Sequence, residues 1–140
     1  RLSLAPYSYP VIGDLDPLVA LLTLVAIVVF VAPAVLHLTA ALQTLVLATL
    51  APDRGGISET VQVIAYATAP CVFAGYPHPV LRFVCALYGT ALLFVGLCEV
   101  HGTTSGRAAV AGAVPAALLF GSALGGFDAL RAVLRLAGLI

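Results

Sequence analysis

The sequence predicts an all-α fold: a polytopic transmembrane helical bundle of about four spanning helices, the first long and kinked, with a short C-terminal amphipathic helix. Of its 140 residues, 62% are apolar and 9% are charged, whereas about a quarter of the residues in a soluble domain are charged. Long apolar runs recur, and about 20 apolar residues suffice to cross the hydrocarbon core of a bilayer. The chain has room for several passes and for no separate soluble domain.

The first apolar run, Leu15 to Ala51, is too long for one straight crossing. As a helix it would extend roughly 55 Å at about 1.5 Å per residue, against a hydrocarbon core of about 30 Å. Pro33 lies inside the run and cannot donate a hydrogen bond to the Val29 carbonyl. We expect one long helix kinked near Pro33, with two short passes as the alternative.

The next two apolar runs, Val61 to Tyr76 and Val80 to Leu97, are separated by the turn-like sequence Pro77 to Pro79. Two spanning helices joined by so short a link must be antiparallel neighbours. Ser58 is a favourable N-cap residue and Glu59 suits the first turn, so the first of the two helices is expected to begin near Glu59.

A fourth spanning helix is expected at Arg107 to Phe120, after the loop of residues 102–106. Like the first two, it contains an interior proline: Pro115 frees the Ala111 carbonyl, as Pro70 frees that of Tyr66. In hydrocarbon each freed carbonyl must find another donor. Kinked packing explains these prolines, and a cavity or hinge of the kind found in transporters is the alternative.

The end of the chain, Phe127 to Ile140, has an amphipathic pattern. Its charged residues fall on one narrow helical face: Asp128, Arg131 and Arg135. A helix of this kind lies flat at the membrane interface, or it extends a spanning helix beyond the membrane. The expected organisation is a linker at 1–14 that follows an upstream segment, a transmembrane domain at 15–124 and a C-terminal interfacial helix at 125–140.

The sequence contains no arrangement typical of an enzyme. No serine–histidine–acid set, HExxH, P-loop or glycine-rich dinucleotide turn is present. The three cysteines lack a metal-binding spacing and are expected to be small packing residues: Cys71, Cys85 and Cys98. The net charge of zero provides no field for nucleic acid. We expect no catalysis, metal or cofactor.

Three ionisable residues are candidates for a functional site. His37 lies well inside an apolar run, where ionisable groups are functional candidates by default; a hydrogen bond between helices and proton transfer both remain open. Glu99 and His101 resemble an acid–base pair. Because they are two residues apart on a helix, they point in different directions, so we expect them to form a solvated helix end.

Several short motifs occur in a characteristic order. They are Gly55-Gly56, then residues 65–70 (AYATAP) with Tyr66 and Pro70, then Val100-His101-Gly102, and finally Ser105-Gly106-Arg107-Ala108. This order resembles the Yip1-type family of multi-pass membrane proteins, particularly its prokaryotic branch, over about Leu15 to Leu124. The resemblance implies a five-helix bundle whose first helix would precede Arg1, and it adds Tyr66, Pro70 and Arg107 to the candidate functional or packing residues.

The resemblance implies little about activity. Eukaryotic relatives act in vesicle traffic and contact prenylated Rab-type GTPases, but prokaryotic members have no established activity. We expect a non-catalytic scaffold or interaction partner in the cell membrane. Its expected partners are lipid and other membrane proteins or itself, without nucleic acid and without an identified small-molecule substrate. The alternatives are a small transporter or channel, which needs a water-lined cavity near His37, and an accessory subunit of a larger membrane complex.

Overall fold

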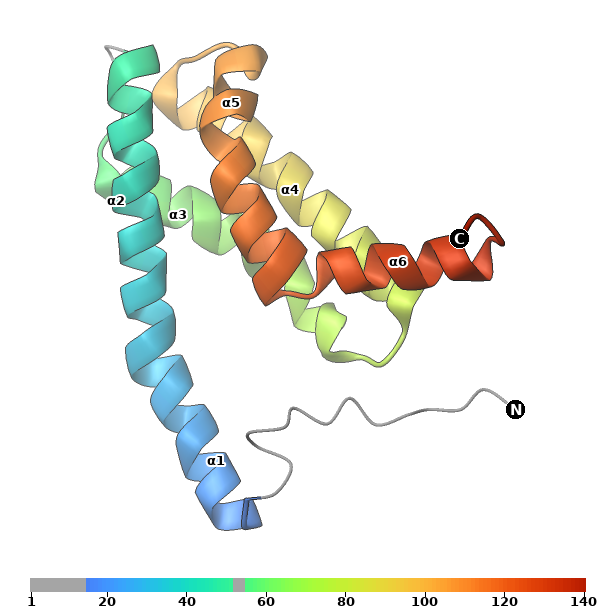
Figure 1. The fold of residues 1–140 in the computed structure, drawn as a ribbon. Helices are drawn as coiled ribbons and strands as arrows, with labels where there is room; N and C mark the ends of the chain where they lie inside the picture. The colour runs from blue at the N-terminus through green and yellow to red at the C-terminus, as the bar shows by residue number, and fades with distance from the viewer. Residues whose placement is uncertain (1–14, 52–54) are drawn as a thin grey trace. The chain divides into compact units, whose positions relative to one another are not determined.

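The computed structural model describes residues 15–51 and 55–140, which form helices and no strand (Figure 1). The predicted linker at residues 1–14 lies outside this part of the chain. The elements are α1 (Pro17–Ala26), η1 (Ile27–Val31), α2 (Ala32–Leu50), α3 (Ile57–Thr68), η2 (Ala69–Gly75), α4 (Pro79–His101), α5 (Ser105–Ala116), η3 (Ala117–Ala123) and α6 (Gly126–Leu136). Within the described residues, four continuous segments are long and apolar enough to span a membrane: Pro17–Leu50, Ile57–Gly75, Pro79–His101 and Ser105–Ala123. The predicted transmembrane bundle is confirmed.

The chain divides into two compact units between Leu36 and His37. In the first, α1 begins after Asp16, whose Oδ1 accepts a hydrogen bond from the Leu18 backbone N–H at 2.9 Å. Pro17 occupies the first helical position, where its missing N–H leaves no hydrogen bond unmade. No residue of α1 or η1 is buried, and these apolar side chains suit a lipid environment.

The long first helix continues past its proline, as predicted. The segment η1 is a turn of π-helix that ends two residues before Pro33. Such local adjustments are one way in which a spanning helix satisfies backbone groups near a proline. The break predicted near Pro33 therefore takes the form of a π-helical turn, and one continuous helix replaces the alternative of two short passes.

In the second unit, α3 begins earlier than the sequence suggested. Its N-cap is Gly56, in an extended conformation, and Ser58 lies inside the first turn. The prediction of Ser58 as N-cap was wrong because the Gly56 carbonyl already accepts the backbone N–H of Thr60 at 3.2 Å. Gly55 lets the chain pass the end of α4, since a Cβ there would lie 3.1 Å from the Val100 carbonyl oxygen.

The antiparallel hairpin predicted around Pro77 to Pro79 is present. Both α3 and η2 pack along α4, and the chain tightens into a 3-10 helix over Ala69–Gly75 at Pro70. At Gly89 of α4, a Cβ would lie 2.7 Å from the Ala67 carbonyl oxygen. The backbones of the two helices therefore approach closely, as small residues allow between helices in lipid.

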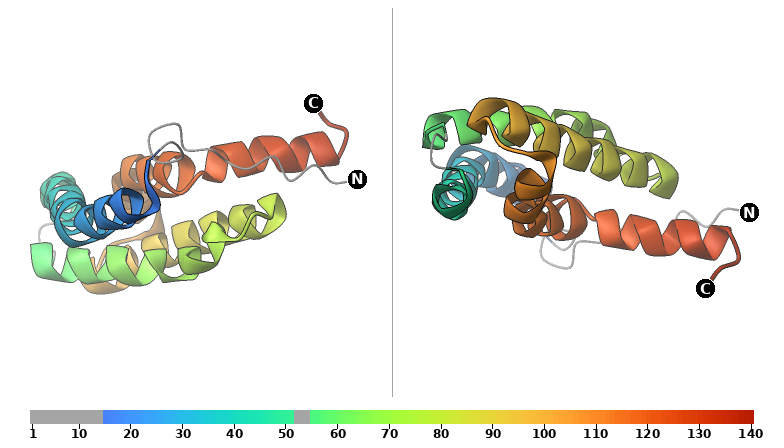
Figure 2. Two further views of the ribbon diagram at one scale, coloured as in Figure 1. Left: turned by 90° about the horizontal axis from the view of Figure 1, so that it is seen from below. Right: turned by 90° about the horizontal axis from the view of Figure 1, so that it is seen from above.

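The remaining helices also pack on α4. Both α5 and η3 contact it, and α6 contacts α4 and η3. The expected fourth helix is longer than predicted, because it begins at Ser105 and runs as a π-helix from Ala117 to Ala123 beyond Pro115. Gly125, with φ of +71°, allows the turn into α6, which continues from the end of the orange helix in both views of Figure 2.

Candidate functional site

Three helices contribute polar side chains to one buried group of residues. Thr44 comes from α2, Thr60 from α3 and His101 from α4, and their relative exposures are 6%, 0% and 1%. Thr60 Oγ1 lies 2.8 Å from Thr44 Oγ1 and 3.1 Å from His101 Nε2. A chain of hydrogen bonds therefore connects three helices through Thr60. We call these three residues the Thr60 cluster.

The proton count favours one direction of hydrogen bonding in this cluster. Thr44 Oγ1 donates to the Ala40 carbonyl at 2.8 Å, and each hydroxyl has a single proton. Thr60 Oγ1 can likewise donate to the Gly56 carbonyl at 3.1 Å, and it lies 2.8 Å from Thr44 Oγ1. Whether the single Thr60 proton goes to Gly56 or to Thr44, Thr60 Oγ1 can only accept from His101, so His101 donates its Nε2–H. This tautomer is assigned from the hydrogen-bond network.

His101 differs from the prediction of a solvated helix end. It is the last residue of α4, followed by Gly102 with φ of +54°, and it points inward. Glu99, two residues earlier, is exposed. The two side chains point in different directions, as expected for this spacing. Glu99 faces outward, whereas His101 faces the interior of the bundle. The hydrogen bond of Nε2 to Thr60 lowers the cost of burying this imidazole.

Gln43 is a second buried polar residue on the same face of α2. It is 1% exposed, and within the described residues neither its Oε1 nor its Nε2 has a hydrogen-bond partner. An unsatisfied buried amide costs about 1–3 kcal/mol. We therefore expect Gln43 to reduce the stability of this bundle.

The other candidates named from the sequence do not join the Thr60 cluster. His37, Tyr66, Glu99 and Arg107 lie outside it, and Pro70 is half-buried at the start of η2. Their functional roles remain predictions. Sequence analysis did not select Thr44 or Thr60 as site residues.

The cysteines occupy packing positions. Cys71 and Cys85 are buried, and Cys71 Sγ donates to the Cys85 carbonyl at 3.7 Å. Across residues 15–51 and 55–140, no group of three or more His, Cys, Asp or Glu side chains lies close enough together to hold a metal ion.

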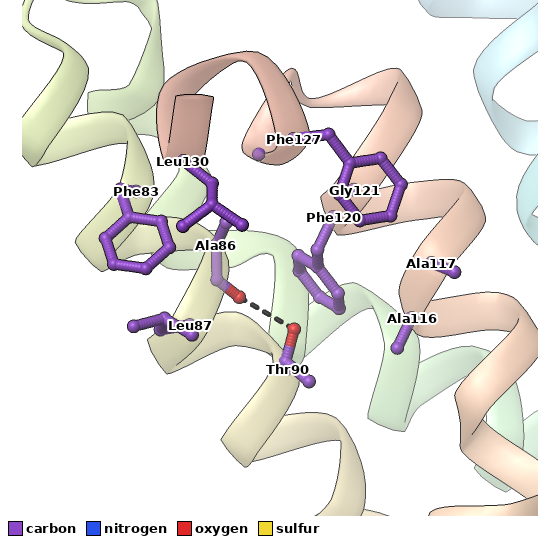
Figure 3. Close-up of a pocket in the computed structure, with 11 residues that line it drawn as sticks. Phe83, Ala86, Leu87, Thr90, Ala116, Ala117, Phe120, Gly121, Phe127 and Leu130 are labelled. Carbon is purple, nitrogen blue, oxygen red and sulfur yellow. Dashed lines mark hydrogen bonds between the residues drawn. The ribbon is translucent and has the colours of Figure 1, made fainter. Parts of the chain in front are cut away.

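An apolar groove lies between α4, η3 and α6 (Figure 3). It has a volume of about 230 Å³, and its walls include Phe83, Leu87, Thr90, Phe120, Phe127 and Leu130. The Thr90 hydroxyl donates to the Ala86 carbonyl of its own helix at 2.8 Å. This groove therefore presents hydrocarbon surface rather than reactive groups.

Fold and site together define the class: a multi-pass helical membrane protein whose buried polar groups bind one another between helices. The chain matches the Yip1 domain over residues 2–126 and belongs to the Yip1 family. The resemblance expected from the short motifs is thus confirmed. No curated protein matches the chain, and no solved structure matches it.

Proposed function

We propose that this chain is a non-catalytic scaffold of the cell membrane, which binds other membrane proteins or further copies of itself within the bilayer. The Thr60 cluster supports this proposal most directly. Its hydroxyl and imidazole groups hydrogen-bond across α2, α3 and α4 and are buried. A catalytic or transport site would present such groups to a substrate, whereas here they hold three helices together.

The surface of the second unit, with few charges and a large apolar area, supports the same function. Glu59, Glu99 and Arg107 lie on the surface of the second unit. Large apolar side chains cover much of the rest, including Val95 and Val110, each 66% exposed. A spanning bundle with this surface offers lipids and neighbouring helices an apolar contact area.

A transporter or channel requires a path lined by polar groups and water. The groove between α4, η3 and α6 has phenylalanine and leucine walls, and the one hydroxyl among its lining residues bonds within its own helix. This lining favours the scaffold. An accessory subunit would be a scaffold whose partner is a larger complex, so the identity of the partner decides between the two.

The proposal is tested by cross-linking the full-length chain in its native membranes, extracting it in a mild detergent and identifying bound proteins by mass spectrometry. We expect a specific membrane protein, or a second copy, to be recovered. Thr60→Val should reduce this recovery. Thr68→Val should not, because the Thr68 hydroxyl bonds to the Ala65 carbonyl of its own helix, at 2.9 Å. Recovery of the chain alone, or solute flux through the purified chain in vesicles, would contradict the proposal.

A further inference from the structure

We propose that the groove between α4, η3 and α6 holds one acyl chain of a membrane phospholipid, with the phosphate of that lipid beside Arg82. This inference is independent of the scaffold function. It rests on the depth of the groove, the chemistry of its walls and the position of one arginine.

The groove follows the first half of α4, which is long and apolar enough to span a membrane. Its lining residues on this helix run from Phe83 to Thr90, and α4 begins at Pro79. At about 1.5 Å per residue, the groove extends roughly 10 Å along the helix and starts about one turn inside its end. This is the depth at which the upper part of a lipid acyl chain lies.

The walls suit hydrocarbon and not water. In Figure 3 the rings of Phe83, Phe120 and Phe127 surround the space together with Leu87 and Leu130. A water molecule needs two to four polar partners to remain in a cavity. Thr90, whose hydroxyl bonds to the Ala86 carbonyl, does not provide them.

The size of the groove distinguishes a lipid chain from a protein helix. A helix with its side chains is about 10–12 Å across, so a groove of about 230 Å³ admits a single chain of methylenes or one side chain but not a helix. In a spanning bundle, the medium at this depth is lipid hydrocarbon. Lipid chains therefore reach the groove from the bilayer itself.

A lipid chain gains no hydrophobic free energy on leaving its neighbours, because lipid tails are as apolar as leucine. Prolonged binding must come from van der Waals contact with the groove and from attraction at the headgroup. Arg82 directly precedes Phe83, and its Nε donates to the Ala74 carbonyl at 3.1 Å. This bond retains the guanidinium charge and fixes it at the outer end of the groove.

The start of α6 lies beside the same arginine. A Cβ on Gly125 would be 3.4 Å from Arg82 Cδ and 3.5 Å from Arg82 Nη1, and Gly126 lines the groove. On α6, the exposed side chains of Asp128 and Arg131 lie 3.9 Å apart. A phosphate at this end of the groove would therefore meet the positive charge of Arg82 where α4 and α6 converge.

The test uses the full chain in vesicles of phosphatidylcholine and phosphatidylglycerol that contain a small fraction of phospholipid with a diazirine on its acyl chain. An excess of unlabelled vesicles is fused with the labelled ones before irradiation, and labelled residues are mapped by mass spectrometry. We expect labels to persist at Phe83, Leu87 and Leu130 and to disappear at Val95 and Val110, which are exposed but lie outside the groove.

Two matched variants test the groove itself. Ala117→Trp places an indole in the groove from an exposed position, whereas Ala91→Trp makes the same change at an exposed position of α4 that does not line it. We expect label at Phe83 to fall to the background level in the first variant and to stay at the wild-type level in the second. Equal circular dichroism spectra and unfolding midpoints would establish that both variants are folded.

Three results would overturn the proposal. The first is equal loss of label at Phe83 and Val95 during the chase, which would mean that lipids exchange freely from the groove. The second is a cross-link from a second copy of the chain to the groove, which would make a protein side chain the occupant. The third is preferential labelling by a diazirine fatty acid over the phospholipid, which would assign the groove to a free carboxylate lipid.

Discussion

Thr60 Oγ1 and His101 Nε2 lie 3.1 Å apart although 41 residues separate them in the sequence. This hydrogen bond connects the start of α3 to the end of α4. Because Thr60 also contacts Thr44 of α2 at 2.8 Å, one hydroxyl lies between two partners on different helices. The stability of the bundle should therefore respond strongly to this residue.

Replacing Thr60 by valine should destabilise the bundle by about 1–3 kcal/mol, because the His101 and Thr44 groups would be left buried without this partner. The free energy of unfolding of the full chain in detergent micelles measures the effect. Thr68→Val is the matched control and should change it by less than about 0.5 kcal/mol. Equal effects of the two substitutions would contradict the role assigned to Thr60.

The contact between Thr44 and Thr60 should appear as a coupling energy. In a double-mutant cycle of Thr44→Val and Thr60→Val, the two losses should be non-additive by about 0.5–2 kcal/mol, since both substitutions remove the same hydrogen bond. The measurement is again unfolding in micelles. Strict additivity would mean that the two hydroxyls do not interact.

Gln43→Leu should stabilise the protein. The amide of Gln43 is buried without a hydrogen-bond partner among the described residues, and replacing it with an apolar side chain of similar size removes a desolvation cost of about 1–3 kcal/mol. Gln62→Leu, at an exposed position of α3, is the control and should have a small effect. A loss of stability in the Gln43 variant would show that its amide makes an interaction essential to the fold.

Two glycine substitutions should act in opposite directions. At Gly89, a Cβ would collide with the Phe120 ring and lie 2.7 Å from the Ala67 carbonyl oxygen, so Gly89→Ala should destabilise by about 1–3 kcal/mol. At Gly106 in α5, a Cβ would meet no atom within 4 Å. Gly106→Ala should therefore stabilise, by up to about 1 kcal/mol through helix propensity. Unfolding midpoints in micelles measure both effects. If Gly89→Ala were the more stable of the two variants, the close contact of α3 and α4 would be contradicted.

The spanning helices could be predicted because run length and turn residues are local properties. The short link at Pro77 to Pro79 imposes an antiparallel hairpin whatever surrounds it. The N-cap of α3 could not be fixed in this way. The backbone at Gly56 begins the helix before Ser58, where the chain passes the end of α4 and a Cβ at Gly55 would crowd Val100.

The Thr60 cluster was missed for a different reason. Its formation depends on how three helices are rotated about their axes, and the local sequence determines this rotation only weakly. One signal was nevertheless available for His101. It follows Leu93 and Leu97 at intervals of four residues, and all three are buried on one face of α4. That spacing predicts an inward-facing imidazole.

The groove between α4, η3 and α6 could not be foreseen from the sequence. Its walls come from residues far apart in the chain, such as Phe83 and Leu130. The amphipathic pattern of α6 predicts a helix but does not determine where it packs. The resulting space depends on the turn at Gly125 and on the close approach of Gly126 to Ala86.

A spanning bundle requires that α3, α4 and α5 cross the membrane in alternating directions. Single cysteines at Ser58, His78, Thr104 and Ser122, in a chain whose native cysteines are replaced by alanine, test it with a membrane-impermeant maleimide applied to sealed vesicles of known orientation. We predict that positions 58 and 104 react from one side of the membrane and positions 78 and 122 from the other. Reaction of all four positions from the same side would contradict the membrane-spanning bundle.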